Sequence, residues 1–427
     1  MPKAEQLTSD SVPTPMAHYS QGSRVGDLIF LAGQIASDYE TGVPAELGRQ
    51  PGYEYYGSDI KDQTRYVLEN IKASLEDAGS DLDHVVKTQV FILDAELFNE
   101  FDEVWREFFP APPPRTTVQT GPKGLLVPGT LVEIDVIAVR ADATEQPEAV
   151  SSDRVPKPIA NYTQAARWGD FIFPAGQVAS HFGEGGIAPE ARVDPAFPYY
   201  ASAIERQTAY TLDTLRTLLE DAGSDLDHVV KAQVFLTDLN DFWEFDTVWK
   251  QYFTTPPPRT TLQVGKLLLD QALVEIDLIA VRKDGSITPE VVSTDAAPRP
   301  KAAYNQAVIA GDLVFLAGQL ASDFETGVPP EATVDPNFRF YGSEIESQTD
   351  YVMTRHMEPV LEAAGTSLEN VVKAQTFLTD LDNFHGYDKV WKRHFETPPP
   401  RTTIELAGDG LLVPGTLVEI DVIAARP

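Results

Sequence analysis

The sequence predicts an α+β fold in which one type of domain occurs three times in tandem. The segment EDAGSDLDHVVK at 76–87 returns unchanged at 220–231, and VPGTLVEIDVIA at 127–138 returns unchanged at 413–424. Copies are 142 to 144 residues apart, which is too long for a solenoid repeat, so each copy is expected to be a whole domain. The domains are expected at 1–144, 153–284 and 295–427.

The stretches that join the copies have the composition of linkers. Residues 140–158 and 282–300 are rich in Pro, Ser, Asp and Ala. At about 3.3 Å per residue, each stretch is long enough to cross one domain and enter the next.

Each copy is expected to contain the same elements, which the first copy illustrates in order. A hairpin over 18–36 turns at Gly26 and Asp27. Ser58 is a candidate N-cap for a helix with one apolar face, and Gly79 ends that helix. A strand over 84–93, a helix over 97–108 and strands over 116–120 and 131–139 follow. The order β-β-α-β-α-β-β predicts a mixed sheet with both helices on one face.

The last strand of the copy predicts how the domains associate. Its even-numbered residues, 132 to 138, are aliphatic and suit a face packed under the helices. Its other face mixes Glu133 and Asp135 with aliphatic residues, which suits an interface that contains a polar pocket. We therefore expect a closed pseudo-threefold arrangement within one chain, a monomeric pseudo-trimer for which higher assembly stays open. The alternative is three independent domains that associate with other chains.

Composition excludes several classes of function. The chain has 65 acidic and 33 basic residues and a net charge of −32, which disfavours nucleic acids and anionic membranes as partners. It has no cysteine, and its seven histidines have no metal-ligand spacing and suit surface or strand-end positions, so we expect no metal site. No apolar run is long enough for a signal peptide core or a membrane span, which predicts a cytoplasmic protein.

A proline-braced arginine occurs once in each copy. Three prolines precede Arg115, Arg259 and Arg401, and a strand that contains Glu133, Glu275 or Glu419 follows about one hairpin later. A proline triplet is stiff and extended, so it fixes the direction in which the arginine leaves the chain. Arginine on a rigid base suits recognition of a small planar anion. The simpler alternative is a structural ion pair between the arginine and the glutamate.

These motifs together resemble the RidA (YjgF-type) family of enamine/imine deaminases. The matching features are a tyrosine near the start (Tyr19, Tyr162, Tyr304), Ala-Gly-Gln after the second strand, the Val-Val-Lys strand, Pro-Arg-Thr-Thr and Val-Glu-Ile-Asp. The resemblance covers all three copies. It implies a chorismate-mutase-like fold and a trimer with ligand clefts between neighbouring subunits, fused here into one polypeptide.

The resemblance also implies roles for particular residues. Arg115, Arg259 and Arg401 match the arginine that grips the substrate carboxylate; Glu133, Glu275 and Glu419 match the acid/base glutamate; Tyr19, Tyr162 and Tyr304 match the cleft tyrosine. The chain departs from the family where a cysteine is replaced by Thr117, Thr261 or Thr403, and where a frequent asparagine is replaced by Asp102, Asp246 or Asp388. These changes leave the substrate open.

The implied reaction is hydrolysis of a 2-imino or enamine acid to a 2-oxo acid and ammonia at interdomain clefts, or a related hydrolysis in a catabolic pathway. It requires a small carboxylate substrate but no cofactor. The main alternative is a non-enzymatic carboxylate binder or chaperone-like protein on the same scaffold. A ribonuclease is disfavoured by the acidic charge, and a Ser/Lys amidohydrolase is disfavoured because Lys87, Lys231 and Lys373 are expected on a solvated strand face.

Two further features distinguish the copies. Each copy carries aromatic residues at the end of a long loop (Tyr53, Tyr55, Tyr56; Phe197, Tyr199, Tyr200; Phe338, Phe340, Tyr341), which suits either a lid over the cleft or a satellite hydrophobic cluster. Copy two has a last hairpin two residues shorter, which predicts altered or inactive clefts at its borders.

Overall fold

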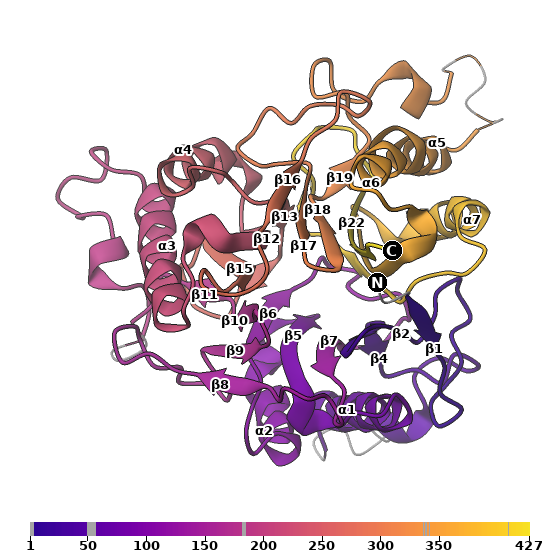
Figure 1. The fold of residues 1–427 in the computed structure, drawn as a ribbon, viewed down its shortest axis with the longest axis horizontal. Coiled ribbons are helices and arrows are strands. Elements are labelled where there is room, and N and C mark those ends of the chain that lie inside the picture. Colours follow the sequence, from indigo (N-terminus) through magenta and orange to yellow (C-terminus); the bar gives the residue numbers. More distant parts are fainter. Residues whose placement is uncertain are drawn as a thin grey trace.

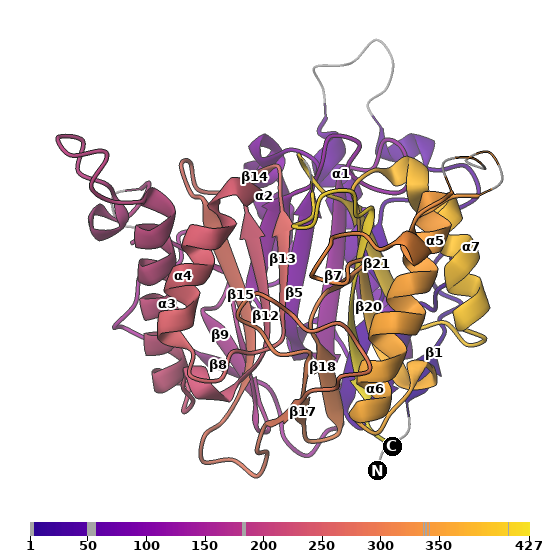
Figure 2. The ribbon, with the colours of Figure 1, turned by 90° about the horizontal axis from the view of Figure 1, so that it is seen from above.

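The computed structural model describes residues 4–48, 57–181, 185–335, 337, 340, 342–408 and 410–427. Three similar units surround a common axis, with their strands toward the axis and their helices on the outside (Figure 1). In the perpendicular view the strands run through the middle of the molecule, with α3 and α4 on one side and α5 and α7 on the other (Figure 2). The pseudo-trimer expected from the sequence is therefore confirmed.

The first unit follows the predicted order of elements, with two further short strands, β1 before the hairpin and β4 after it. Its strands and helices are β1 (Glu5–Leu7), β2 (Gly22–Val25), β3 (Leu28–Leu31), β4 (Gln34–Ile35), α1 (Asp59–Asp77), β5 (Val85–Ile92), α2 (Phe98–Phe108), β6 (Arg115–Gln119) and β7 (Val132–Val139). Gly26 turns the first hairpin with φ +57°. The Ser58 side chain accepts a hydrogen bond from the Lys61 N–H, as expected of an N-cap.

The second and third units repeat this order. The second contains β8 (Glu148–Val150), β9 (Ala165–Trp168), β10 (Phe171–Pro174), β11 (Gln177–Val178), α3 (Ala203–Asp221), β12 (Val229–Leu236), α4 (Phe242–Tyr252), β13 (Arg259–Gln263), β14 (Lys266–Leu267) and β15 (Val274–Val281). The third contains β16 (Glu290–Val292), β17 (Ala307–Ala310), β18 (Leu313–Leu316), β19 (Gln319–Leu320), α5 (Glu344–Tyr351), α6 (Glu358–Ala363), β20 (Val371–Leu378), α7 (Phe384–His394), β21 (Arg401–Glu405) and β22 (Val418–Ala425).

The first helix of the third unit is interrupted by a π-helical segment, Val352–Met357. Between the shared Gln-Thr pair and the terminal glycine, this copy is one residue longer than the first copy. A single inserted residue is accommodated in a helix as a π-bulge. The segment buries His356, whose ring nitrogens lie 2.9 Å from Gln319 Oε1 and Ser322 O. The expectation that histidines occupy surface or strand-end positions is therefore wrong for His356.

The order of strands in each sheet separates the arginine from the glutamate of the same copy. In the third unit the order is β16-β17-β18-β22-β20-β21, with β20 and β21 parallel and β22 antiparallel to β20. Phe377 of β20 pairs with Ile404 on one side and with Glu419 on the other. The strand that carries Glu419 is therefore next to the arginine strand along the chain but not in the sheet.

The linkers contain short strands that sequence periodicity did not reveal. β8 pairs with β9 and β16 pairs with β17, each antiparallel at the edge of the following unit's sheet, as β1 pairs with β2. Each linker thus anchors the unit that follows it.

The two faces of each last strand pack as the alternation predicts. In the first unit Val132, Ile134, Val136 and Ala138 belong to the core between the sheet and its helices. Ile137 and Val139 belong instead to a core shared by all three units, which also contains Ile279 and Ile423. The inward faces of the three sheets therefore bury one another.

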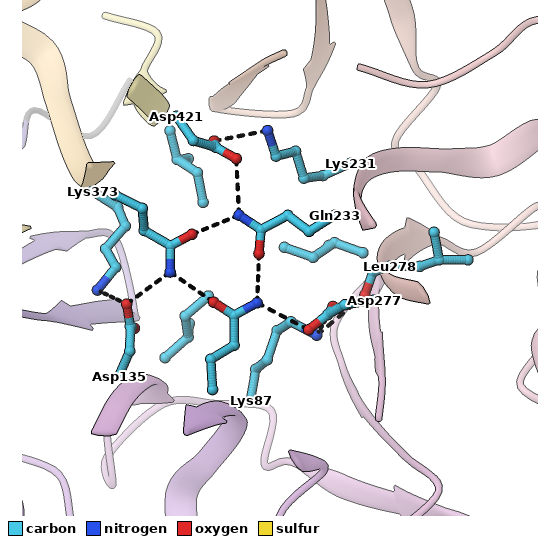
Figure 3. Close-up of a pocket in the computed structure, with 13 residues that line it drawn as sticks. Lys87, Asp135, Lys231, Gln233, Asp277, Leu278, Lys373 and Asp421 are labelled. Carbon is cyan, nitrogen blue, oxygen red and sulfur yellow. Dashed lines mark hydrogen bonds and ion pairs between the residues drawn. The ribbon is translucent and has the colours of Figure 1, made fainter. Parts of the chain in front are cut away.

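A ring of polar side chains closes this shared core on the axis (Figure 3). The amide groups of Gln89, Gln233 and Gln375 form a cycle in which each Nε2 donates to the next Oε1 at 2.6 to 2.7 Å. Each amide also donates to an aspartate of the next unit, at 2.9 to 3.1 Å. The ring is directional, because each glutamine donates to the next unit in the same sense around the axis.

Three buried ion pairs surround the ring. Lys87 pairs with Asp277, Lys231 with Asp421 and Lys373 with Asp135, at 2.5 to 2.7 Å across the three seams. The same aspartates accept hydrogen bonds at 2.6 Å from the hydroxyls of Thr116, Thr260 and Thr402. The expectation that these lysines lie on a solvated face is therefore wrong. Their strand face points to the axis, which is the interior of the assembly.

Among the described residues, no helix is long and apolar enough to cross a membrane.

Replacing one glutamine of the ring should lower the free energy of unfolding of the protein. In Gln233→Leu, the Gln375 Oε1 loses its donor and the Gln89 amide loses an acceptor, and both groups stay buried. The expected loss in the free energy of unfolding is about 1–3 kcal/mol, measured by denaturant titration. Gln251→Leu on the exposed side of α4 is the matched control. Equal stabilities of the two variants would contradict the role assigned to the ring.

Candidate active site

The residues singled out in the sequence meet at the three seams between units. The structure brings together Glu133 and Tyr19 of the first unit with Arg401 of the third, Glu419 and Tyr304 of the third with Arg259 of the second, and Glu275 and Tyr162 of the second with Arg115 of the first. We name each site after its glutamate. The arginine and glutamate of one copy thus belong to different sites. The roles of these residues in catalysis and binding remain predictions.

Each arginine is held by the element that precedes it. The last proline of each triplet accepts a backbone hydrogen bond at 3.0 Å from the strand alongside: Pro114 from Thr88, Pro258 from Ala232 and Pro400 from Ala374. The arginine is the next residue and begins its own strand. The proline segment therefore fixes where the guanidinium enters the seam.

The guanidinium lies among aromatic rings of the second helix of its own unit. The Cζ of Arg115 is 4.9 to 5.3 Å from the ring centroids of Phe98, Phe101 and Trp105. The other two arginines have the equivalent contacts. The tyrosine of the neighbouring unit adds a fourth ring, 5.6 to 5.9 Å from Cζ. Aromatic faces stabilise a desolvated cation.

An aspartate of the same helix pairs with each arginine. Arg115 Nη2 donates to Asp102 Oδ1 at 2.8 Å, Arg259 to Asp246 at 2.8 Å and Arg401 to Asp388 at 3.1 Å. The second carboxylate oxygen pairs with an exposed cation one helical turn on, Arg106, Lys250 or Lys392. The structural ion pair of each arginine is therefore formed with this aspartate, and not with the glutamate as the simpler alternative expected. The aspartates lie 13 residues before the arginine in every copy, a recurrence that was visible in the sequence.

Each guanidinium group has at least one buried N–H group with no hydrogen-bond acceptor among the described residues. The Nη1 atoms of Arg115, Arg259 and Arg401 are buried and have no hydrogen-bond partner among the described residues, and the same holds for Nε of Arg259 and Arg401. A buried donor without a partner costs about 1–3 kcal/mol, a cost that a bound acceptor would remove. Arginine donors of this kind suit a carboxylate.

The glutamate depends on the glycine of the Ala-Gly-Gln motif for space. A Cβ atom on Gly33, Gly176 or Gly318 would lie 1.9 to 2.3 Å from the carboxylate Oε1 of Glu133, Glu275 or Glu419, respectively. Only glycine therefore leaves room for the carboxyl group in this position. The backbone N–H of Thr403 donates to Glu133 across the seam, and that of Thr117 donates to Glu275.

Burial raises the pKa of each of the three glutamates. Desolvation, followed by the nearby Asp135, raises the pKa of Glu133 to about 8. Lys373 and Arg401 act in the opposite direction but do not cancel these effects. The pKa values of Glu275 and Glu419 are also raised to about 8, again mainly by burial. The carboxyl groups are therefore mostly protonated at pH 7.

Two of the sites open into cavities of different size. The cavity at the Glu133 site is about 280 Å³ and is lined by Tyr19, Tyr39, Phe384, Arg401 and Thr403, among others. The cavity at the Glu419 site is about 870 Å³ and is lined by Phe242, Trp243, Arg259, Tyr304 and Phe324, among others. Among the described residues, no group of three or more His, Asp or Glu side chains is arranged to hold a metal ion.

The aromatic loops do not line these two cavities where the structure describes them. Phe197, Tyr199, Tyr200 and Phe340 are exposed. Phe197 and Tyr200 contact each other edge-on. Residues 53, 55, 56, 338 and 341 lie outside the described part of the chain, so for them both readings, a lid or a satellite cluster, remain predictions.

Comparison with known proteins agrees with this architecture. The family model described as Endoribonuclease L-PSP matches residues 9–140, 152–282 and 294–426. The chain therefore belongs to this family, with three copies of its domain. The resemblance to RidA proteins is thereby confirmed.

Particular relatives match one copy at a time. A RutC family protein of Pyrococcus abyssi is 39% identical over 137 residues, which cover 32% of this chain and 97% of the relative. The chloroplastic Reactive Intermediate Deaminase A of Arabidopsis thaliana is 34% identical over 140 residues, 33% of this chain and 67% of that protein. A chorismatase crystal structure matches 80% of this chain and 93% of its own with a TM-score of 0.50 and 12% identity, a similarity of fold.

Removing the partner of a buried arginine should destabilise the protein. In Asp246→Ala, Arg259 stays buried without an anion, and the expected loss is about 3–5 kcal/mol in the free energy of unfolding. Asp246→Asn keeps a hydrogen-bond acceptor and should lose less. Asp270→Ala, which removes a largely exposed carboxylate paired with Lys266, is the control and should change stability by less than about 0.5 kcal/mol. A loss for Asp246→Ala as small as that of the control would contradict the assigned pairing.

Proposed function

We propose that the chain hydrolyses reactive 2-imino or enamine acids to 2-oxo acids and ammonia at its interdomain sites. One observation carries the proposal: each seam contains two features side by side. The first is a buried arginine with donors that have no acceptor among the described residues, and the second is a glutamate whose pKa is raised to about 8. Relatives named reactive intermediate deaminases support the same class of activity.

The arginine would bind the substrate carboxylate. Its Nη2 is already engaged by the aspartate, so Nη1 remains for a ligand at all three sites, together with Nε in Arg259 and Arg401. The exposed cation beyond the aspartate offsets that carboxylate's charge, which leaves the arginine net attractive to an anion. The aromatic rings exclude water and strengthen the interaction.

The glutamate would move the proton. Protonated Glu133 donates its proton to the substrate nitrogen while a water oxygen forms a bond to the C=N carbon. The resulting carboxylate then accepts a proton from the added water. The glutamate, protonated again, gives this proton to the amino group, the C–N bond breaks and ammonia leaves. The hydroxyl group on the same carbon becomes the carbonyl of the 2-oxo acid and returns its proton to the glutamate. One water is consumed for each ammonia released, and the chain's own residues supply the acid and the base.

The main alternative is a carboxylate-binding protein without catalysis, because the arginine alone accounts for binding. A ribonuclease is disfavoured by the net charge of −32, which repels a phosphate backbone. The proton-carrying glutamates favour hydrolysis over binding alone, because a binder has no use for a carboxyl group that is costly to bury.

Removing the three acid/base groups should abolish turnover but not binding. We expect Glu133→Gln/Glu275→Gln/Glu419→Gln to lower kcat/KM about 10²–10⁴-fold for imines generated in situ by an amino-acid oxidase, with 2-oxo acid affinity retained. Activity of the unaltered protein should fall as the pH rises through about 8, because the protonated form is lost there. Glu290→Gln, on an exposed strand position, is the control.

Ammonia release that does not exceed the uncatalysed rate in the unaltered protein would favour the binding alternative. Full activity of the triple variant would exclude the glutamates from the reaction.

A further inference from the structure

The sites of this chain are not chemically equivalent, although one motif builds them all. At the Glu133 site the Tyr19 hydroxyl donates to the Tyr39 hydroxyl at 2.9 Å, and both phenols line the cavity. At the Glu419 site Phe324 stands where the first copy has Tyr39, so Tyr304 has no corresponding phenol beside it. The first cavity thus gains a polar group that the second lacks.

The position of this aromatic residue is fixed by the backbone. Tyr39 and Phe324 both have φ +58°, a left-handed conformation that is costly for a bulky residue. In the first unit the Tyr39 N–H donates to Ser37 Oγ at 3.0 Å, and Asp38 Oδ1 accepts from the backbone N–H groups of Glu40, Thr41 and Gly42. The third unit repeats these bonds around Ser322 and Asp323. The loop therefore holds the ring at the cavity.

A second difference comes from the unit that supplies the arginine. Trp243 of α4 lines the Glu419 cavity, is 62% exposed, and packs edge-on against Phe242 at 5.0 Å. The equivalent residue is His385 at the Glu133 site, whose arginine comes from the third copy, and Asn99 at the Glu275 site, whose arginine comes from the first copy. An exposed tryptophan at the edge of a cavity is a ready contact for an apolar ligand group.

The geometry points to a division of substrates between the sites: the Glu419 site takes 2-imino acids with bulky apolar or aromatic side chains, and the smaller Glu133 site takes those with small or polar side chains. This inference rests on the proposed function. In both sites the substrate carboxylate binds the arginine and the C=N group lies at the glutamate. The side chain then extends toward Trp243 and Phe324 in one site and toward the Tyr19 and Tyr39 phenols in the other.

The test compares two imines, derived from phenylalanine and from alanine. The ratio of their kcat/KM values, phenylalanine over alanine, is measured for the unaltered chain and for variants at the two differing positions. Trp243→Asn, which introduces the residue that the Glu275 site has at this position, removes the apolar contact and should lower the ratio five- to twentyfold. Phe324→Tyr should lower it, and Tyr39→Phe should raise it. Trp243 is exposed, so its replacement leaves the core intact.

Tyr199→Asn is the matched control, because Tyr199 is 97% exposed and lines neither cavity. Its ratio should equal that of the unaltered chain. If the imines are turned over but Trp243→Asn and Phe324→Tyr leave the ratio unchanged, the division of substrates is wrong while the proposed function stands.

A direct binding measurement separates this inference from the proposed reaction. If neither imine is turned over, the proposed function fails, and calorimetry with phenylpyruvate and pyruvate then decides. The preference for phenylpyruvate should fall at least fivefold in Trp243→Asn. An unchanged preference would overturn the inference.

Discussion

The cycle of three glutamine amides on the axis, with its three lysine–aspartate pairs, is the constraint on which the rest of this structure depends. All nine side chains are buried, so each must find its partner in another unit or leave a costly group without one. The glutamines donate in one direction around the axis, and each lysine reaches the aspartate of the same neighbour. These directional contacts are satisfied in one relative position of the three sheets. Apolar contacts alone would depend less on that position.

The sites follow from that fixed position. The aspartate of the ring and the glutamate of the site lie two residues apart on the same face of β7, β15 or β22, so the contacts that align the axis also align the glutamate. The threonine after each arginine bonds the ring aspartate of the neighbouring unit, which ties the arginine strand to the same frame. Stability and site geometry are therefore supplied by one set of contacts. Differences between sites arise at the periphery, in loops and helix ends that the ring does not restrain.

Much of this could be predicted from the sequence, because repetition and periodicity report directly on elements. The helix after Ser58, the hairpin at Gly26 and the interface face of the last strand were all legible in local patterns. The burial of Lys87 could not be predicted in this way. The alternation of residues along a strand is the same whether a face is exposed to solvent or buried against another unit. The partner of each glutamate depends on sheet order: Arg401 and Glu419 lie close along the chain, but β20 separates their strands. Strands such as β8, with three residues, are too short to show any period.

The pairing of residues across the seams is tested most directly by two double variants in the imine hydrolysis assay. Arg401→Ala/Glu133→Gln alters one site twice, whereas Arg401→Ala/Glu419→Gln alters two residues of the same repeat that serve different sites. We expect the first double variant to retain the rate of Arg401→Ala alone and the second to lose the contribution of the Glu419 site as well. The reverse result, in which Glu419→Gln costs nothing further and Glu133→Gln does, would contradict sites shared between units.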